Sequence, residues 1–497
     1  MDSQKDHKFT SHIKIVARGI SDTCQRFCKL RVKGDMGVKT IVVRENHLGD
    51  YRDQLEAIGA NLVSRKAFNE LEDRIQAQGL KTPTLKVATR IEIRDDAMAL
   101  PGGPYPKTDK FEVALTDVPL EIQQKYSTKG TLEDWKQGLA KLGRHNTRIK
   151  LAFALPFVGP LSAIMSVEHV GIQLVGEGGS GKSAIGVAAS SVWGWDPNPV
   201  QADRNGFGQS WNSTVNNLER VFAGYNQTFL FANETRLAGK KPKEIAENVL
   251  ETIMKIEGST GKGRLVEAGT RRWFAPLLST SNYSVQALAK EAGQECDSAL
   301  LDRLVDIPPP ADGFKMFEEL HGFDDPAVFA VELKRFASEN HGWPGREFIR
   351  KLLEAKAKDE PALKQFIKDR RAAYMRRAKH KIVSASRDLI RLHGKFATIY
   401  AAGALAIKYK VLPFTRDALR FAILKCEADH VAYVEEGGES KPQTSPLDKL
   451  RDQLREHRPS LINLADYDEK DHSAWGYHNR HDDGGEEVLL KKGLLDF

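Results

Sequence analysis

Apolar and polar positions along the chain form blocks of two kinds, and their order predicts a multi-part α/β protein. Up to about residue 100, two amphipathic stretches that each end at a glycine predict helices, Asp50 to Ile58 and Ala67 to Gln78. Short apolar runs in the same region predict strands: Ile13 to Ala17, Thr40 to Val43, Leu85 to Thr89 and Ile91 to Ile93. We therefore expect a small N-terminal α/β domain over residues 1–100.

The next block, residues 101–168, is predicted to be a helical lead-in that begins at the turn-rich segment Pro101 to Pro106. Residues 131–166 have a helical pattern, with Thr131 as the N-cap and acidic residues in the first turn. The mostly apolar run from Ile149 to Met165 predicts one buried helix beside the strand that follows.

Strand and helix patterns then alternate over residues 169–312, which predicts an α/β layer fold. Residues 313–438 are mostly helical and basic, and Gly437 to Ser445 has the composition of a linker. Residues 439–497 carry a helical pattern from Pro446 to His457 and a short strand from Glu487 to Leu490. We expect a small, winged-helix-like C-terminal domain there.

The strongest chemical signal is a phosphate-binding loop after the apolar strand Ile172 to Val175. The pattern G-x-x-x-x-G-K-[ST] predicts that a strand-to-helix turn cradles the phosphates of ATP and that its serine holds Mg²⁺. A glycine-rich turn without a ligand is the alternative, and the helix pattern after the loop favours nucleotide binding. The predicted binding residues are Gly176, Gly178, Gly179, Ser180, Gly181, Lys182 and Ser183.

A nucleotide site needs an acidic partner strand, and Thr228 to Glu234 is the candidate. Glu234 would orient or deprotonate the attacking water, and the preceding Asn233 would help to hold Mg²⁺ through a bound water. Many ATPases have an acid at that position, so we expect slower hydrolysis or weaker Mg²⁺ binding. A second strand, Trp273 to Thr280, leads to Asn282, a candidate sensor of the γ-phosphate.

Basic residues follow the site in two places. The glycine-rich segment from Gly258 to Arg264, with Lys262, Arg264 and the later Arg271, is either a solvent-exposed hairpin or a loop that grips a DNA backbone. Arg303, beside a strand-like run, is either a surface ion-pair partner or a residue that reaches the γ-phosphate of a neighbouring subunit.

Composition adds limits on the possible function. The formal net charge of +7 permits contact with nucleic acid, and cations are concentrated between Lys364 and Arg391, as a solvated helix face or a surface for phosphates. Four scattered cysteines exclude a disulfide framework. No long apolar run or apolar N-terminal signal is present, so we expect a cytoplasmic protein with no membrane segment.

Together these motifs resemble the domain-of-unknown-function 927 family, which is similar to superfamily 3 and AAA+ ATPases and occurs largely in mobile genetic elements. The resemblance covers about residues 105–410, and residues 1–100 add nothing specific to it. It rests on Gly130 to Trp135, Leu151 to Leu161, Gly171 to Ser183, Ala188 to Gly194 and Arg391 to Phe396, with Asn233, Glu234 and Asn282. It implies a hexameric ring ATPase whose hairpin residues Lys262 and Arg264 contact DNA. Asn233 departs from the acidic pair that this arrangement implies.

Three functions follow as alternatives. The first is an ATP-dependent DNA helicase or translocase of a mobile element, acting on single-stranded or forked DNA, with a primase or another replication or defence protein as partner. The second is an ATP-binding switch or scaffold that turns over little ATP. The third is a metabolic kinase or transferase, which would need a small-molecule pocket and no DNA-binding hairpin.

Overall fold

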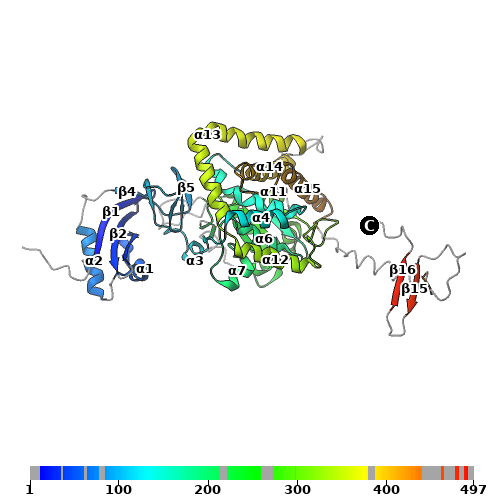
Figure 1. Ribbon diagram of the computed structural model, residues 1–497, viewed down its shortest axis with the longest axis horizontal. Coiled ribbons are helices and arrows are strands. Elements are labelled where there is room, and N and C mark those ends of the chain that lie inside the picture. The colour runs from blue at the N-terminus through cyan, green and yellow to red at the C-terminus, as the bar shows by residue number, and fades with distance from the viewer. Residues whose placement is uncertain are drawn as a thin grey trace, which may run out of the picture. The chain divides into compact units, whose positions relative to one another are not determined.

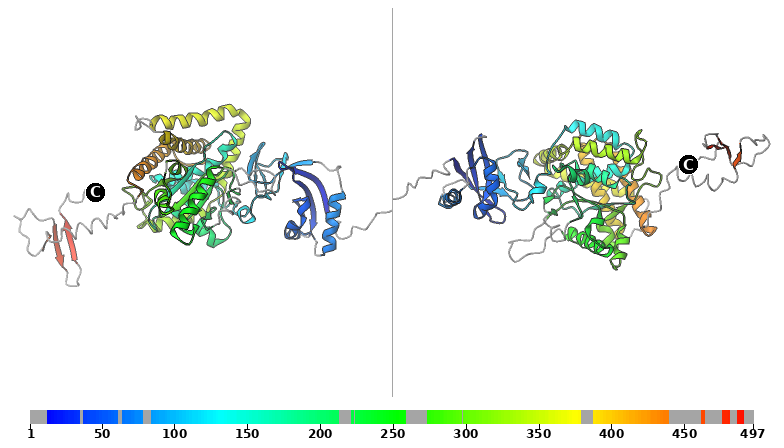
Figure 2. Two further views of the ribbon diagram at one scale, coloured as in Figure 1. Left: turned by 180° about the vertical axis from the view of Figure 1, so that it is seen from behind. Right: turned by 90° about the horizontal axis from the view of Figure 1, so that it is seen from below.

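A computed structural model (Figures 1 and 2) describes residues 12–34, 37–60, 64–77, 84–212, 221–222, 224–258, 273–296, 298–378, 387–438, 461–463, 476–480 and 486–490. Contacts divide the chain into a large unit, Met1–Ser440, and a small unit, Lys441–Phe497. The finer boundaries expected at residues 100, 168 and 312 stay predictions. The chain is a mixed α/β protein with a helical C-terminal region in the large unit.

An N-terminal five-stranded sheet opens the large unit, in the order β3-β2-β1-β4-β8. Strands β1, β2 and β3 form an antiparallel meander, whereas β4 and β8 add in parallel. The alternating apolar residues of the meander pack against the helices on one face, and α2 lies along that face in Figure 1. The bounds are β1 (Ile13–Ser21), β2 (Arg26–Gly34), β3 (Gly37–Arg44), η1 (Glu45–Tyr51), α1 (Arg52–Ala57), α2 (Arg65–Ala77), β4 (Thr84–Ala88) and β8 (Phe111–Val113).

A small antiparallel sheet and several helices lead to the central core: β5 (Glu92–Arg94), β6 (Ala97–Leu100), β7 (Gly103–Tyr105), α3 (Leu120–Gln123), α4 (Leu132–Leu142) and α5 (Thr147–Ala154). Thr131 is confirmed as the N-cap of α4, since its side chain accepts from the backbone N–H of Asp134. The single helix expected from Ile149 to Met165 was wrong. After α5 the chain continues as 3₁₀ turns that contain Pro156 and Pro160, because proline cannot donate the helical hydrogen bond.

The central sheet is entirely parallel, in the order β10-β11-β12-β9-β13. This confirms the α/β layer predicted for the middle of the chain. The strand expected from Trp273 begins later, at Leu277, after Pro276. The bounds are β9 (Gly171–Val175), α6 (Lys182–Ser190), α7 (Pro199–Asn205), β10 (Gln209–Ser210), β11 (Leu230–Asn233), α9 (Pro242–Gly258), β12 (Leu277–Ser281), α10 (Val285–Glu291), α11 (Ser298–Arg303) and β13 (Val305–Ile307).

Four helices follow the sheet: α12 (Pro326–Glu339), α13 (Trp343–Ala378), α14 (Arg387–Lys408) and α15 (Arg416–Glu435). They share one continuous apolar core with the central sheet. Helix α13 is kinked at Asp359, whose backbone is not helical and whose carboxylate accepts from the N–H of Ala362 at 2.9 Å. That bond caps a second helical segment, which runs above α14 in Figure 1.

The small unit contains a three-stranded sheet of β14 (Leu461–Asn463), β15 (Gly476–Arg480) and β16 (Glu486–Leu490). The predicted terminal strand is confirmed, whereas the helix expected from Pro446 to His457 lies outside the described residues. The winged-helix-like assignment therefore stays a prediction. Among the described helices, none is both long and apolar enough to span a bilayer.

Candidate functional site

The site is built around the loop from Gly176 to Gly181, which joins β9 to α6. Gly176, Gly179 and Gly181 have φ angles of 148°, 71° and 99°, a region that strongly favours glycine. No atom lies within 4 Å of the point where a Cβ would stand on Gly178 or Gly179. The loop thus presents open backbone at the amino end of α6, where N–H groups are available to an anion.

Lys182 closes the inner side of this loop. Its ammonium donates to the carbonyl oxygens of Gly176 and Glu177, both at 2.6 Å, and to Ser180 Oγ and Asn282 Oδ1, both at 3.2 Å. Burial lowers the pKa of Lys182 to about 8, although the nearby carboxylates of Glu234 and Glu177 act in the opposite direction. The structure therefore brings Lys182 and Asn282 together, with one cation facing four oxygen acceptors.

The strand order explains why Asn282 and Asn233 are both near the loop. Strand β12 lies between β9 and β11, so the carboxyl ends of all three parallel strands meet at one edge of the sheet. Asn233 Oδ1 accepts from Ser183 Oγ at 2.8 Å and from Thr280 Oγ1 at 2.7 Å, while its Nδ2 donates to the carbonyl oxygen of Arg204 at 2.8 Å. An amide suits this position, because an aspartate there could not donate to Arg204.

Glu234 directly follows β11 and has a left-handed backbone, with φ 64° and ψ 82°. Such a conformation in a non-glycine residue costs about 1–3 kcal/mol and often marks a functional position. Its N–H donates to Thr280 Oγ1 at 2.8 Å, which fixes the turn. The side chain is 39% exposed and forms an ion pair with Arg236. Glu234 therefore lies on the open side of the site, at the edge that carries Lys182.

A segment that the sequence patterns did not indicate packs directly on the loop. The N–H of Met316 donates to the carbonyl oxygen of Ser180 at 3.1 Å, and Lys315 Nζ donates to that of Gly179 at 3.2 Å. A Cβ on Gly181 would lie 2.6 Å from the ring of Phe317. From the sequence, the only available sign that this segment reaches the loop was its position after β13, the strand that pairs with β9.

Buried ion pairs hold that segment in place. Arg148 has no exposed side-chain surface and contacts Glu318 at 3.2 Å and Asp429 at 2.6 Å. It also donates to the carbonyl oxygen of Pro308 at 2.9 Å. Since Glu318 follows Lys315 closely and Asp429 belongs to α15, the helical region is linked to the wall of the loop.

Arg303 lies at the amino ends of the central strands, opposite the ends that carry the loop. It ends α11 just before β13, and its carbonyl oxygen would be 2.5 Å from a Cβ on Gly171, the first residue of β9. A five-residue strand spans about 13 Å, so Arg303 and the loop of the same chain are at opposite ends of β9. The structure does not bring Arg303 into the site of its own chain.

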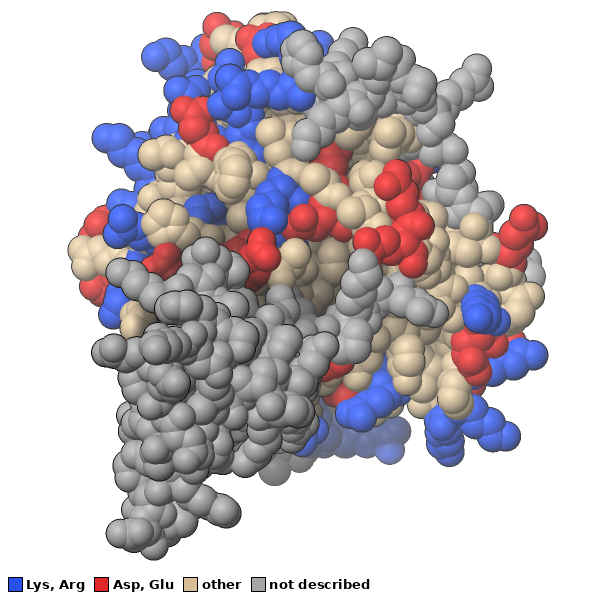
Figure 3. All heavy atoms as spheres, turned by 90° about the vertical axis from the view of Figure 1, so that its right-hand side faces the viewer, with Lys and Arg blue, Asp and Glu red and all other residues tan. Residues whose placement is uncertain are grey.

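The predicted DNA-binding residues Lys262, Arg264 and Arg271 lie outside the described residues. The second segment of α13 is described and is rich in cations. Lys368, Arg376 and Arg377 are exposed, whereas Lys364 pairs with Glu360 at 2.6 Å. Figure 3 shows Lys and Arg side chains gathered toward the top of one face, where the far end of α13 lies in Figure 1, with acidic side chains among them.

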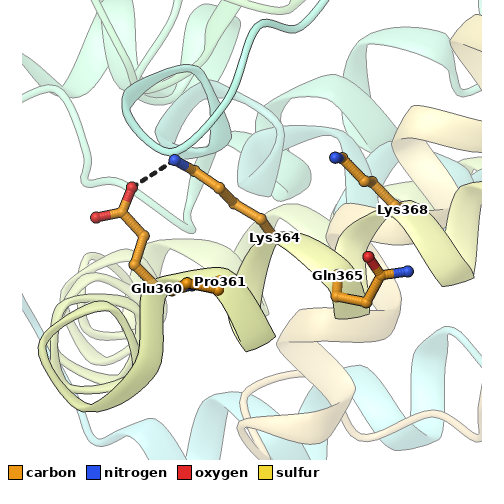
Figure 4. A pocket seen from close by; sticks show the side chains of 5 residues that line it. All are labelled: Glu360, Pro361, Lys364, Gln365 and Lys368. Carbon is orange, nitrogen blue, oxygen red and sulfur yellow. Dashed lines mark ion pairs between the residues drawn. The ribbon is translucent and has the colours of Figure 1, made fainter.

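The kink of α13 borders an open hollow of about 490 Å³. Figure 4 shows Lys364 and Lys368 of its lining projecting to the same side, with Glu360 turned toward Lys364. Phe366 nearby has Lys408 Nζ 4.3 Å and the guanidinium of Arg370 5.5 Å from its ring centre. This segment is therefore a cationic surface with one neutralised lysine at its start.

Within the described part of the chain, no cluster of three or more His, Cys, Asp or Glu side chains could hold a metal ion. A metal at the loop would accordingly depend on Ser183 and Asn233, with water as the remaining ligands. Mg²⁺ commonly keeps several waters and takes few protein ligands, so the residues fit this ion.

These features define an α/β protein with a parallel central sheet and a glycine loop at one edge of it. A protein described as "SCCmec type IV Cch - active helicase" has a similar fold, with a TM-score of 0.59 and 14% sequence identity over 97% of this chain and 84% of that chain. The family described as "Domain of unknown function (DUF927)" matches residues 2–272, more than half of the chain, so the chain belongs to this family. The matched range differs from the expected range of residues 105–410, because it includes the N-terminal region and ends before Asn282 and Arg391. No curated protein matches the chain.

Proposed function

We propose that the protein is an ATP-dependent DNA helicase or translocase of a mobile genetic element, with a P-loop core of the superfamily 3 or AAA+ type. The observation that carries the proposal is the meeting of three features at one edge of the sheet: the glycine loop with Lys182, Asn282 after β12, and Asn233-Glu234 after β11. The fold similarity to the protein described as an active helicase supports the same function.

The residues present fit ATP. Gly178 and Gly179 leave room for phosphates, and Lys182 now donates to loop oxygens that a phosphate oxygen could replace. Bound Mg²⁺ would neutralise charge on the phosphates. Ser183 and Asn233 would hold that ion and its waters, Asn282 would contact the γ-phosphate, and Glu234 would accept the proton of the attacking water. Glu234 must first leave Arg236 to do so.

Arg303 suits a role between subunits. Its place at the edge opposite the loop prevents it from reaching a phosphate in its own chain, while a neighbouring chain in a ring could present its loop there. We propose a hexamer in which Arg303 completes the adjacent site. In that ring, Lys262, Arg264 and Arg271 would grip single-stranded DNA, and the cations of α13 would add backbone contacts.

The experiment that tests this proposal is ATP hydrolysis with and without single-stranded DNA, comparing the wild type with Glu234→Gln. We expect DNA to stimulate the wild type, and the variant to bind ATP but not to hydrolyse it. Turnover that ignores DNA and survives the substitution would overturn the proposal.

The second function, an ATP-dependent switch or scaffold, is favoured by two observations. Asn233 supplies no charge and already uses both ends of its amide, and the Glu234 carboxylate is engaged by Arg236. A switch would bind ATP tightly, assemble with it, and hydrolyse it negligibly with or without DNA. The same assay therefore separates the two functions.

A further inference from the structure

The N-terminal sheet has two chemically different faces. Residues paired across antiparallel strands point to the same side, and the pairs Ile13–Val32 and Leu30–Ile41 face the helices. The alternate residues therefore face away from α2. In β2 these are Phe27, Lys29, Arg31 and Lys33.

The face away from the helices is cationic. Arg31 is directly opposite Lys14 in β1 and Thr40 in β3, and Lys33 is opposite Val38; all five side chains are exposed. Like charges placed opposite each other destabilise a sheet. Among the described residues, Lys14, Arg31 and Lys33 have no carboxylate partner to offset this repulsion.

Acidic side chains are scarce on this face. None of the sequences of β1, β2 and β3 contains Asp or Glu. The carboxylate of Glu112 in β8 pairs with Lys29. Beside that pair the face is closed by a buried apolar group of Phe27, Val87 and Ala114, so the open cationic area is the part around Lys14, Arg31 and Lys33.

We infer that this face, which we call the Arg31 face, is a second nucleic-acid-binding surface and that it takes the backbone of a single strand. Residues two apart in β2 are separated by about 6.8 Å, so Arg31 and Lys33 form a short row of cations along β2, with Lys14 beside Arg31 on β1. Five strands about 4.8 Å apart are too wide for a major groove of about 12 Å. A single strand can lie along the row. This inference goes beyond the proposed ATPase and does not require ATP turnover.

The test uses the full chain and a fluorescent oligothymidine of about 20 nucleotides, without nucleotide, over a range of salt concentrations. One variant combines Lys14→Gln, Arg31→Gln and Lys33→Gln. The matched control removes three exposed cations from the helical layer of the same unit by Arg52→Gln, Arg65→Gln and Lys66→Gln. Both are also made with Lys262→Gln and Arg264→Gln, so that the predicted hairpin does not hide the effect.

We expect the first variant to bind at least about tenfold more weakly near 0.1 M salt, and the slope of log affinity against log salt to fall by about 2 in magnitude. The control variant should keep both values. The inference would be overturned if the first variant and the control variant had equal affinity and equal slope, both with and without the hairpin substitutions. That result is expected if the partner of the Arg31 face is an acidic protein. ATP hydrolysis without DNA reports on the proposed function separately, since the Arg31 face plays no part in it.

Discussion

The low pKa of Lys182 makes a specific prediction about ATP binding. Burial lowers that pKa to about 8, and a phosphate beside the ammonium would raise it, because an opposite charge favours the charged form. Binding above pH 8 therefore requires the protein to take up a proton. At pH 9 about one tenth of the free protein would carry protonated Lys182, so the affinity for ATP should fall about tenfold per pH unit above 8.

The folding equilibrium has the opposite sign. A lysine whose folded-state pKa lies below its unfolded value binds fewer protons when folded, between pH 8 and the ordinary lysine range. As the pH rises through this window, Lys182 therefore contributes increasing stability to the nucleotide-free protein. A fall in ATP affinity over the same window cannot be assigned to unfolding caused by this group.

The assay is equilibrium binding of a fluorescent, non-hydrolysable ATP analogue from pH 8 to 9.5 at constant ionic strength. Phosphate groups are already fully ionised in this range, so they do not contribute. The matched variant is Lys182→Arg, whose charge does not titrate below pH 12. Its affinity, whatever its absolute value, should not change with pH. A flat wild-type profile, or a parallel decline in the arginine variant, would refute the reasoning.

Three further predictions concern the packing around Gly186, the amide of Asn233 and the role of Arg303 between subunits. Gly186→Ala should destabilise the protein by about 1–3 kcal/mol and so lower its thermal midpoint, because the added Cβ would lie 2.0 Å from an aromatic ring of β11. The control is Gly49→Ala, which should leave the midpoint unchanged, since nothing lies within 4 Å of its Cβ position. Asn233→Asp should lower the stability of the nucleotide-free protein by about 1–3 kcal/mol, because the donor to the carbonyl oxygen of Arg204 is lost, and it should strengthen Mg²⁺-dependent ATP binding. Calorimetry measures the stability and nucleotide titration measures the binding. Unchanged stability would contradict the hydrogen-bond assignment. Arg303→Ala should bind ATP without hydrolysing it, and mixing it with Lys182→Ala should restore turnover in mixed rings; no restoration would exclude a role between subunits.

Much of the central site was predictable because its signals are local. Glycines at the positions that need positive φ mark the loop, and an apolar run marks the strand before it. The residues after β11 and β12 could also be named from the sequence. Their meeting with Lys182 could not, since it depends on β12 being inserted between β9 and β11.

Other features depend on contacts that local patterns do not encode. The role of Asn233 as a donor needs the carbonyl oxygen of Arg204, which is reached only in the folded chain. The segment with Lys315 reaches the loop because β13 pairs with β9. In the N-terminal sheet, β2 was not predicted from the sequence, although its apolar residues alternate with lysines and arginines as in a half-buried strand.

The central claim is that ATP hydrolysis at this site drives movement along DNA. Its most direct test is displacement of one strand of a forked duplex by the full chain, with ATP, with a non-hydrolysable analogue, and with Glu234→Gln. The account predicts strand displacement only for the wild type with ATP. ATP binding without displacement, together with hydrolysis that DNA does not stimulate, would contradict it and leave the nucleotide switch as the function.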